Sequence, residues 1–173
     1  MILRLSQKLC TKIKAGSLKT MPLDANPFAD WSAHLFVADR TQYIIVSNTK
    51  SLYSTVLFSK GITNDSHFTE RAMVSIREFM EDDGLAFVYN RFIAPASGAV
   101  SFVKALNRSV TGSMNDLINH ATVWLNEGEL SPADVGFKLN DVLLSSLARS
   151  KADLFRKPRE AFNDLVNSIN EVT

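Results

Sequence analysis

A short polar stretch of the chain carries the residue types that most readily hold an anion. Its polar side chains belong to Asn107, Arg108, Ser109, Ser113, Asn115 and Asp116. Apolar residues before it and regularly spaced apolar residues after it predict a strand, a turn and a helix whose N-cap is Ser109. The start of a helix offers free backbone N–H groups and a partial positive charge. Arg108 adds a guanidinium fork, so this turn would hold a phosphate or a carboxylate.

The same side chains also admit a purely structural interpretation. Arg108 can pair with a neighbouring acid, and the serine and asparagine side chains can act only as helix caps. Nothing in the sequence decides between the two interpretations.

A second group of reactive residue types comprises His34, Asp116 and His120. Ser113, Asp116 and His120 share one helix face, but side chains stacked along a helix point nearly parallel, which disfavours a Ser–His–Asp triad. A hydrolase, with or without a metal, would need His34 to join Asp116 and His120 from another element. The alternative is a local contact between Asp116 and His120 within the helix. The chain has no H-E-x-x-H cluster and no phosphate-binding loop, so we expect neither a metal nor a cofactor.

A predicted β-hairpin would place further residues beside this helix. Trp31, His34 and Arg40 belong to it, and we expect them to contribute to the same site. Trp31 and Tyr43 with Arg40 nearby could stack on a nucleic-acid base. The alternative for Trp31 is a place in the hydrophobic core, because its apolar area is large.

Bulk composition excludes several classes of protein. The 173 residues are 46% hydrophobic, which suits a single globular domain over residues 1–173. Lys and Arg number 19 against 18 Asp and Glu, so net charge gives no support to a nucleic-acid partner. Cys10 is the single cysteine, which excludes an intrachain disulfide. The chain lacks a signal peptide and an apolar run of about 20 residues, so we expect a cytoplasmic protein with no membrane partner.

Strands and helices must position these side chains. Apolar alternation predicts strands at 1–6, 31–37, 42–47 and 52–58. The stretch that begins at Ala99 contains β-forming residues and reads as a further strand, although its few residues are also compatible with a buried helix. Helical spacing predicts helices at 7–15, 64–82 and 110–126, with two more beginning at Ser131 and Pro158. Segment 85–93 is compatible with either. The fold class expected is α+β, with a mostly antiparallel sheet of about four to five strands packed against several helices.

Two motifs occur together in this chain. The hairpin reads W-x-A-H-L…D-R from Trp31 to Arg40, and the helix start reads N-R-S-V-x-G-S-M-N-D from Asn107. This pair resembles an uncharacterised bacterial domain-of-unknown-function family, over most of the chain up to the Arg156-Lys157-Pro158 segment. The resemblance implies a bacterial cytoplasmic protein, whose relatives include small proteins and domains fused to plasmid or transposon passenger domains. It implies no activity, cofactor or catalytic residue.

The function expected from the sequence is a binding or regulatory module with an unknown anionic ligand or a protein partner. Arg108 would anchor a phosphate or nucleic-acid backbone, Ser109 and Ser113 would add hydroxyl contacts, and Asn107 and Asn115 would orient the ligand. The alternative is the hydrolase that uses His34, Asp116 and His120.

Overall fold

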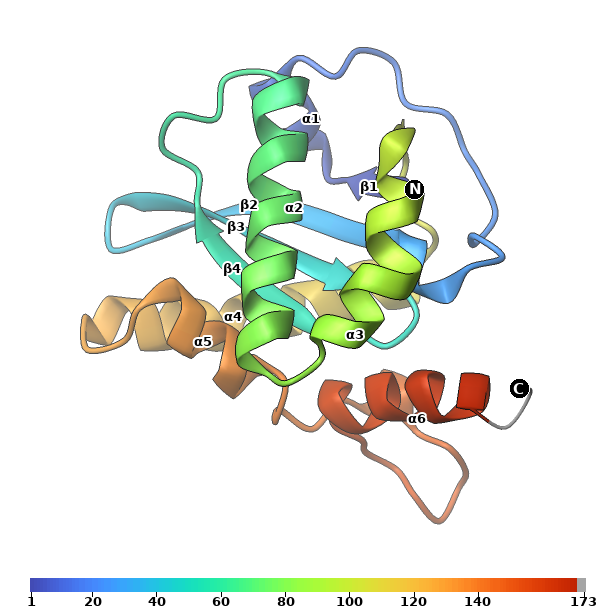
Figure 1. The fold of residues 1–173 in the computed structure, drawn as a ribbon. Coiled ribbons are helices and arrows are strands. Elements are labelled where there is room, and N and C mark those ends of the chain that lie inside the picture. The colour runs from blue at the N-terminus through green and yellow to red at the C-terminus, as the bar shows by residue number, and fades with distance from the viewer. Residues whose placement is uncertain (171–173) are drawn as a thin grey trace.

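A five-stranded sheet in the order β4-β3-β2-β1-β5 forms the centre of the computed structural model, which describes residues 1–170 (Figure 1). The strands are β1 (Ile2–Leu5), β2 (Asp30–Ala38), β3 (Thr41–Asn48), β4 (Ser54–Phe58) and β5 (Ser101–Val103). β1 pairs in parallel with both β2 and β5, whereas β2–β3 and β3–β4 are antiparallel. The α+β class is confirmed. The sheet is mixed and not purely antiparallel, because β1 pairs in parallel on both of its sides, and a strand's side-chain pattern does not encode the direction of its partner.

The helices follow the predicted positions closely. They are α1 (Gln7–Ile13), α2 (Asp65–Asp82), α3 (Ala86–Val88), α4 (Arg108–Glu127), α5 (Pro132–Leu139) and α6 (Pro158–Asn170). Short 3₁₀ segments occupy Pro27–Ala29, Ala94–Gly98 and Ser145–Leu147, and a π-helical turn occupies Tyr89–Ile93. Segment 85–93, which the sequence left open, is therefore helical.

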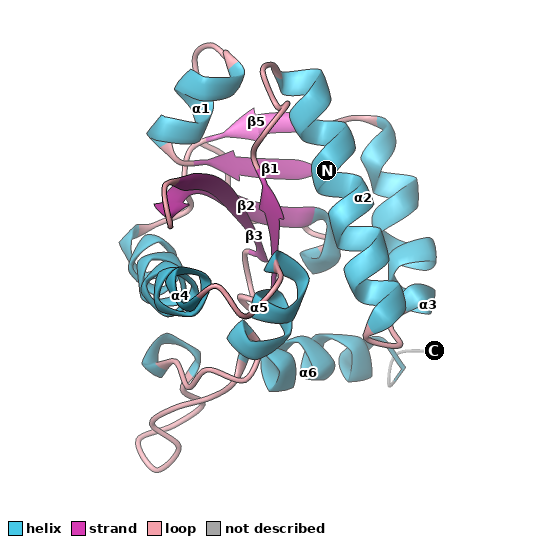
Figure 2. Cartoon of the chain, turned by 90° about the vertical axis from the view of Figure 1, so that its left-hand side faces the viewer, coloured by secondary structure: helices cyan, strands magenta, loops and turns pink. Residues whose placement is uncertain are grey.

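Helices cover both faces of the sheet (Figure 2). On one face Leu3 and Ile44 pack in a core with residues of α1, α2 and α6. On the other face Phe36 and Ile45 pack with residues of α4 and α5. Successive strand residues thus enter opposite cores, as the pleat of a strand requires.

A buried ion pair ties the start of the sheet to the long connection before β2. Arg4 Nε and one terminal nitrogen donate to the two carboxylate oxygens of Asp30 at 2.8 and 2.7 Å. The side chains are 1% and 0% exposed. Arg4 also donates to the carbonyl oxygens of Met21 and Pro22 at 2.9 and 2.8 Å. Arg4 therefore satisfies backbone groups of a connection that has little regular structure of its own.

The start of α4 differs from the prediction by two residues. Asn107 is the N-cap, and its side-chain oxygen accepts from the N–H of Val110 at 2.9 Å. The expectation of Ser109 as N-cap was wrong, because two good capping residues compete there and Asn107 occupies the extended conformation that a cap needs. Arg108 and Ser109 are consequently the first two residues of the helix.

Candidate functional site

A hollow forms because β2 extends further than its parallel neighbour β1. The pairing of β1 ends with Leu5 opposite Ala33, and the N–H of Ser6 then donates to the Ala33 oxygen at 3.0 Å. Beyond that point β1 turns into α1, whereas β2 continues to Ala38. The side of β2 next to His34 therefore has no strand against it.

Two adjoining hollows of about 500 and 900 Å³ occupy this space. Both are lined by Ser6, Gln7, His34 and Thr111, and we call the two together the His34 groove. The smaller hollow continues past Lys104 toward Gly16. The larger one follows β2 and α4 and reaches Lys8, Gln42 and Asn115. Its size is typical of a site for a small molecule.

The groove lies at the carboxyl ends of parallel strands. The arrows of β1 and β5 point to the side of the molecule where α1 and α4 lie (Figure 2). The chain leaves β1 into α1, which packs on one face, and leaves β5 toward α4, which packs on the opposite face. In open sheets, ligands bind outside the carboxyl ends of parallel strands at such points of divergence.

His34 is the polar group most deeply set in the groove. It is 7% exposed and lines both hollows, yet its imidazole ring hydrogen-bonds no other residue in the part of the chain that the structure describes. Burial lowers the pKa of His34 to about 4, so near pH 7 its ring is neutral, with one nitrogen as donor and the other as acceptor. No described side-chain nitrogen or oxygen is both fully buried and unpaired, so the His34 ring nitrogens are open to the groove, where water or a ligand can hydrogen-bond to them.

The charge that lines the groove is of one sign. Lys8 and Lys104 contribute to its walls, and none of the described residues lining it is acidic. Two cations in a partly enclosed space without a counter-charge favour an anionic occupant. Arg108 lies four residues after Lys104, exposed at the first position of α4 and outside the groove lining.

The polar residues that were predicted to form a site at the start of α4 lie on several different surfaces of the molecule. Asn115 lies on the groove side, one turn after Thr111. Ser109 and Ser113 line a separate hollow of about 70 Å³. Ser113 Oγ lies 3.0 Å from the Ser109 oxygen and 2.6 Å from Ser146 Oγ. Asn115 thus reaches the groove, whereas Ser113 is held by protein partners.

His34 and the pair Asp116 and His120 lie on different flanks of α4. Asp116 and His120 line a third hollow of about 260 Å³ beside Phe155. At 3.6 residues per turn, Asp116 is roughly 140° around the helix from Thr111, which faces the groove. The structure does not bring these three candidate residues together. Within residues 1–170 no three His, Cys, Asp or Glu side chains lie where they could jointly hold a metal ion.

The remaining hairpin candidates lie outside the groove. Trp31 is buried in the core, and its indole N–H donates to the oxygen of Phe28 at 2.8 Å. Arg40 is at the exposed tip of the β2–β3 turn, where Asp39 and Arg40 both have positive φ, 43° and 58°. Trp31 is therefore a residue of the hydrophobic core, which was the alternative to a role in binding.

The residues predicted for the site did not include Lys8, Lys104 or Thr111, all of which line the groove. Lys104 directly follows β5, and Lys8 follows β1 by three residues. Both lysines lie close to the carboxyl end of a strand. This position indicates a shared site only once the parallel pairing of β1 with β5 is known, because that pairing places the two carboxyl ends side by side.

One family of proteins matches a part of the chain that includes both sequence motifs and the residues of the groove. A family model described as Domain of unknown function (DUF6933) matches residues 2–161. The chain belongs to the DUF6933 family. The match confirms the resemblance and spans this DUF6933 chain from β1 into α6. The chain matches no curated protein and no solved structure at a level that supports a relationship. None of the helices described is long and apolar enough to span a bilayer.

Proposed function

We propose that this chain is a binding module that takes a small anionic ligand, a phosphate or carboxylate compound, in the His34 groove. The observation that carries it is His34 itself, a neutral and nearly buried imidazole without a protein partner. Lys8 and Lys104 supply the positive charge around it. Within the proposal the module is a single-domain protein of the bacterial cytoplasm.

The groove offers a ligand several kinds of contact. The His34 ring would donate one hydrogen bond, and the Thr111 hydroxyl and Asn115 amide, one turn apart on α4, would add others. Lys8 and Lys104 would bind the anionic group as mobile point charges. Arg108 and the positive end of α4 would add to the field without direct contact. A groove of this volume suits a small molecule better than a nucleic-acid duplex.

A thermal-shift screen of the wild-type protein tests the proposed ligand class. The panel would contain inorganic phosphate, nucleotides, sugar phosphates, di- and tricarboxylates, and short DNA and RNA. A ligand at a hundred times its dissociation constant adds about 2.7 kcal/mol of stability. For a domain of this size we expect a rise of roughly 5–10 °C in Tm.

Three lysine and arginine variants locate the anion. Lys104→Ala should remove most of the shift, whereas Lys60→Ala, an exposed lysine away from the groove, should retain it. If Arg108→Ala abolished the ligand-induced rise in Tm and Lys104→Ala preserved it, the anion would bind at the start of α4 instead. No shift with any anionic compound, or equal shifts in wild type and Lys104→Ala, would contradict the proposal.

A further inference from the structure

β4 is an edge strand, and its hydrogen-bonding pattern shows which backbone groups face outward. At one end of its pairing the Asn48 N–H donates to the Tyr53 oxygen at 2.8 Å, and at the other the Ser59 N–H donates to the Gln42 oxygen at 3.0 Å. In an antiparallel ladder every second residue makes these bonds. The alternate residues of β4 therefore turn their backbone N–H and C=O groups away from β3: Ser54, Val56 and Phe58.

Side chains of the protein satisfy part of this outer edge. The Asn140 amide pairs with both backbone groups of Ser54, accepting from its N–H at 2.7 Å and donating to its oxygen at 3.0 Å. The Arg71 guanidinium donates to the Phe58 oxygen at 3.5 Å. The outward N–H and C=O of Val56 have no protein partner among the described residues, although Val56 is only 3% exposed. Buried backbone groups are nearly always paired, so this donor and acceptor call for an occupant.

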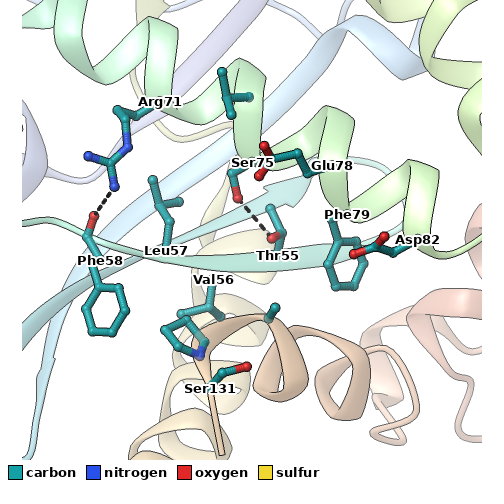
Figure 3. A pocket seen from close by; sticks show the side chains of 13 residues that line it. Thr55, Val56, Leu57, Phe58, Arg71, Ser75, Glu78, Phe79, Asp82 and Ser131 are labelled. Carbon is teal, nitrogen blue, oxygen red and sulfur yellow. Dashed lines mark hydrogen bonds between the residues drawn. The ribbon is translucent and has the colours of Figure 1, made fainter.

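The open part of the edge lies at the floor of a hollow of about 280 Å³. Figure 3 shows β4 running between α2 on one side and the first turn of α5, after Ser131, on the other. The volume far exceeds the roughly 30 Å³ share of one water molecule. A second copy of the chain would present its own β4 at the bottom of the same hollow, and two recessed edges cannot meet. A lone extended chain can enter.

The walls of the hollow carry charge of opposite sign at its two ends. Arg71 lies beside Phe58, whereas Glu78 and Asp82 lie toward the other end of the strand, beyond Ser75 (Figure 3). The Phe58 side chain is 46% exposed at the basic end. An occupant with a basic residue near Glu78 and Asp82 and an apolar residue beside Phe58 would match both features.

We propose that this hollow binds an extended peptide segment as an additional strand on β4. Backbone hydrogen bonds to Val56 and to the Phe58 N–H would hold the segment, and alternate side chains would select its sequence, as in other cases of strand addition. The site is separate from the His34 groove and does not depend on the ligand proposed there.

A peptide library on beads provides the first test. Each ten-residue peptide would carry Val, Ile, Leu or Phe at alternate positions and Lys, Arg, Glu or Thr between them. Fluorescent full-length protein should select peptides with a Lys or Arg at one position. Selected peptides are then resynthesised with methyl groups on alternate backbone nitrogens. Methylation along one edge should abolish binding and methylation along the other should be tolerated, because only one edge of an added strand faces β4.

Two pairs of variants assign the binding to this edge. Phe58→Pro removes the outward N–H without removing a bond to β3, and Phe58→Ala is its control because it removes the ring but keeps the N–H. Phe58→Pro should weaken binding about five- to tenfold more than Phe58→Ala, the effect of one hydrogen bond. Glu78→Lys should weaken the binding of a basic peptide. Glu70→Lys makes the same charge change on the same helix but outside the hollow, and it should leave the binding unchanged.

Several outcomes would overturn the proposal. One is a library in which wild type selects no more beads than Phe58→Pro. Another is tolerance of methylation on both edges, which would mean that the bound peptide is not a strand on β4. A third is self-association of the wild type that Phe58→Pro abolishes, measured by sedimentation, because the occupant would then be a second copy of the chain.

Discussion

The side-chain amide of Asn140 pairs with the backbone of Ser54 as a neighbouring strand would, although the two residues are 86 positions apart. Both residues are fully buried. One turn earlier, a Cβ on Gly136 would lie 2.9 Å from the Phe79 ring and 3.4 Å from the Cα of Thr55. α5 can therefore approach β4 closely because of a glycine, and Asn140 uses that approach to satisfy the strand's edge.

Replacing Asn140 with Ala should destabilise the protein by about 2–4 kcal/mol, because two buried backbone groups of Ser54 lose their partners. Urea denaturation should show a lower midpoint with an unchanged slope. Asn119→Ala, at an exposed position of α4, is the control and should stay within about 0.5 kcal/mol of wild type. Equal stabilities of the two variants would mean that water replaces the amide at no cost.

The second prediction concerns the contribution of the buried ion pair between Arg4 and Asp30 to stability. Arg4→Met should cost about 3–5 kcal/mol, because it leaves the Asp30 carboxylate buried without its counter-charge. The double variant Arg4→Met/Asp30→Leu should recover part of that loss, since neither charge then remains. A double-mutant cycle by chemical denaturation measures the coupling. Strict additivity of the two substitutions would show that the ion pair contributes nothing beyond the separate side chains.

The sequence predicted the existence and type of most elements because each carries its own periodic pattern. Helix 64–82, for example, was expected from the apolar spacing that includes Phe68, Ala72 and Ile76, and α2 is Asp65–Asp82. The parallel pairing of β1 with β5 could not be predicted, since the paired residues are about a hundred positions apart. Side-chain alternation is the same in parallel and antiparallel strands.

The site was less predictable than the fold for a geometric reason. The polar residues at the start of α4 are contiguous in sequence, but the helix turns about 100° per residue and separates Asn115 from Asp116. The His34 groove depends on the difference in length between β1 and β2, which becomes meaningful only when the two strands are known to be neighbours. His34 was a candidate from its residue type, and its isolation from protein partners is a property of the folded chain.

The titration of His34 should make stability depend on pH. Burial lowers its pKa from the usual 6.5 to about 4 in the folded protein. Between these values the unfolded chain binds a proton that the folded protein does not, so the stabilisation is complete above pH 6.5 and is lost as the pH falls toward 4. A shift of this size corresponds to about 3 kcal/mol. Urea denaturation at pH 7.5 and pH 4 measures the change.

Comparison with His34→Gln separates this effect from the titration of carboxylates, which both proteins share. The stability of wild type relative to His34→Gln should decrease by about 3 kcal/mol between pH 7.5 and pH 4. His67→Gln, at an exposed position near the start of α2, controls for removing a histidine. A difference between wild type and His34→Gln that does not change with pH would show that the His34 ring is well hydrated.

Glycine at position 40 should stabilise the protein. Asp39 and Arg40 form the two-residue β2–β3 turn with φ values of 43° and 58°. A residue with a side chain pays roughly 1–2 kcal/mol in this conformation, whereas glycine adopts it freely but loses about 0.5–1 kcal/mol in chain entropy. Arg40→Gly should therefore gain about 0.5–1 kcal/mol by thermal or urea unfolding. Thr41→Gly, one residue later without a positive φ, should destabilise the protein.

The Arg40→Gly variant also tests whether the hairpin tip takes part in binding. Arg40 lies outside the His34 groove, so Arg40→Gly should leave any anion-induced rise in Tm unchanged. Loss of that rise would show that the hairpin tip belongs to the binding site.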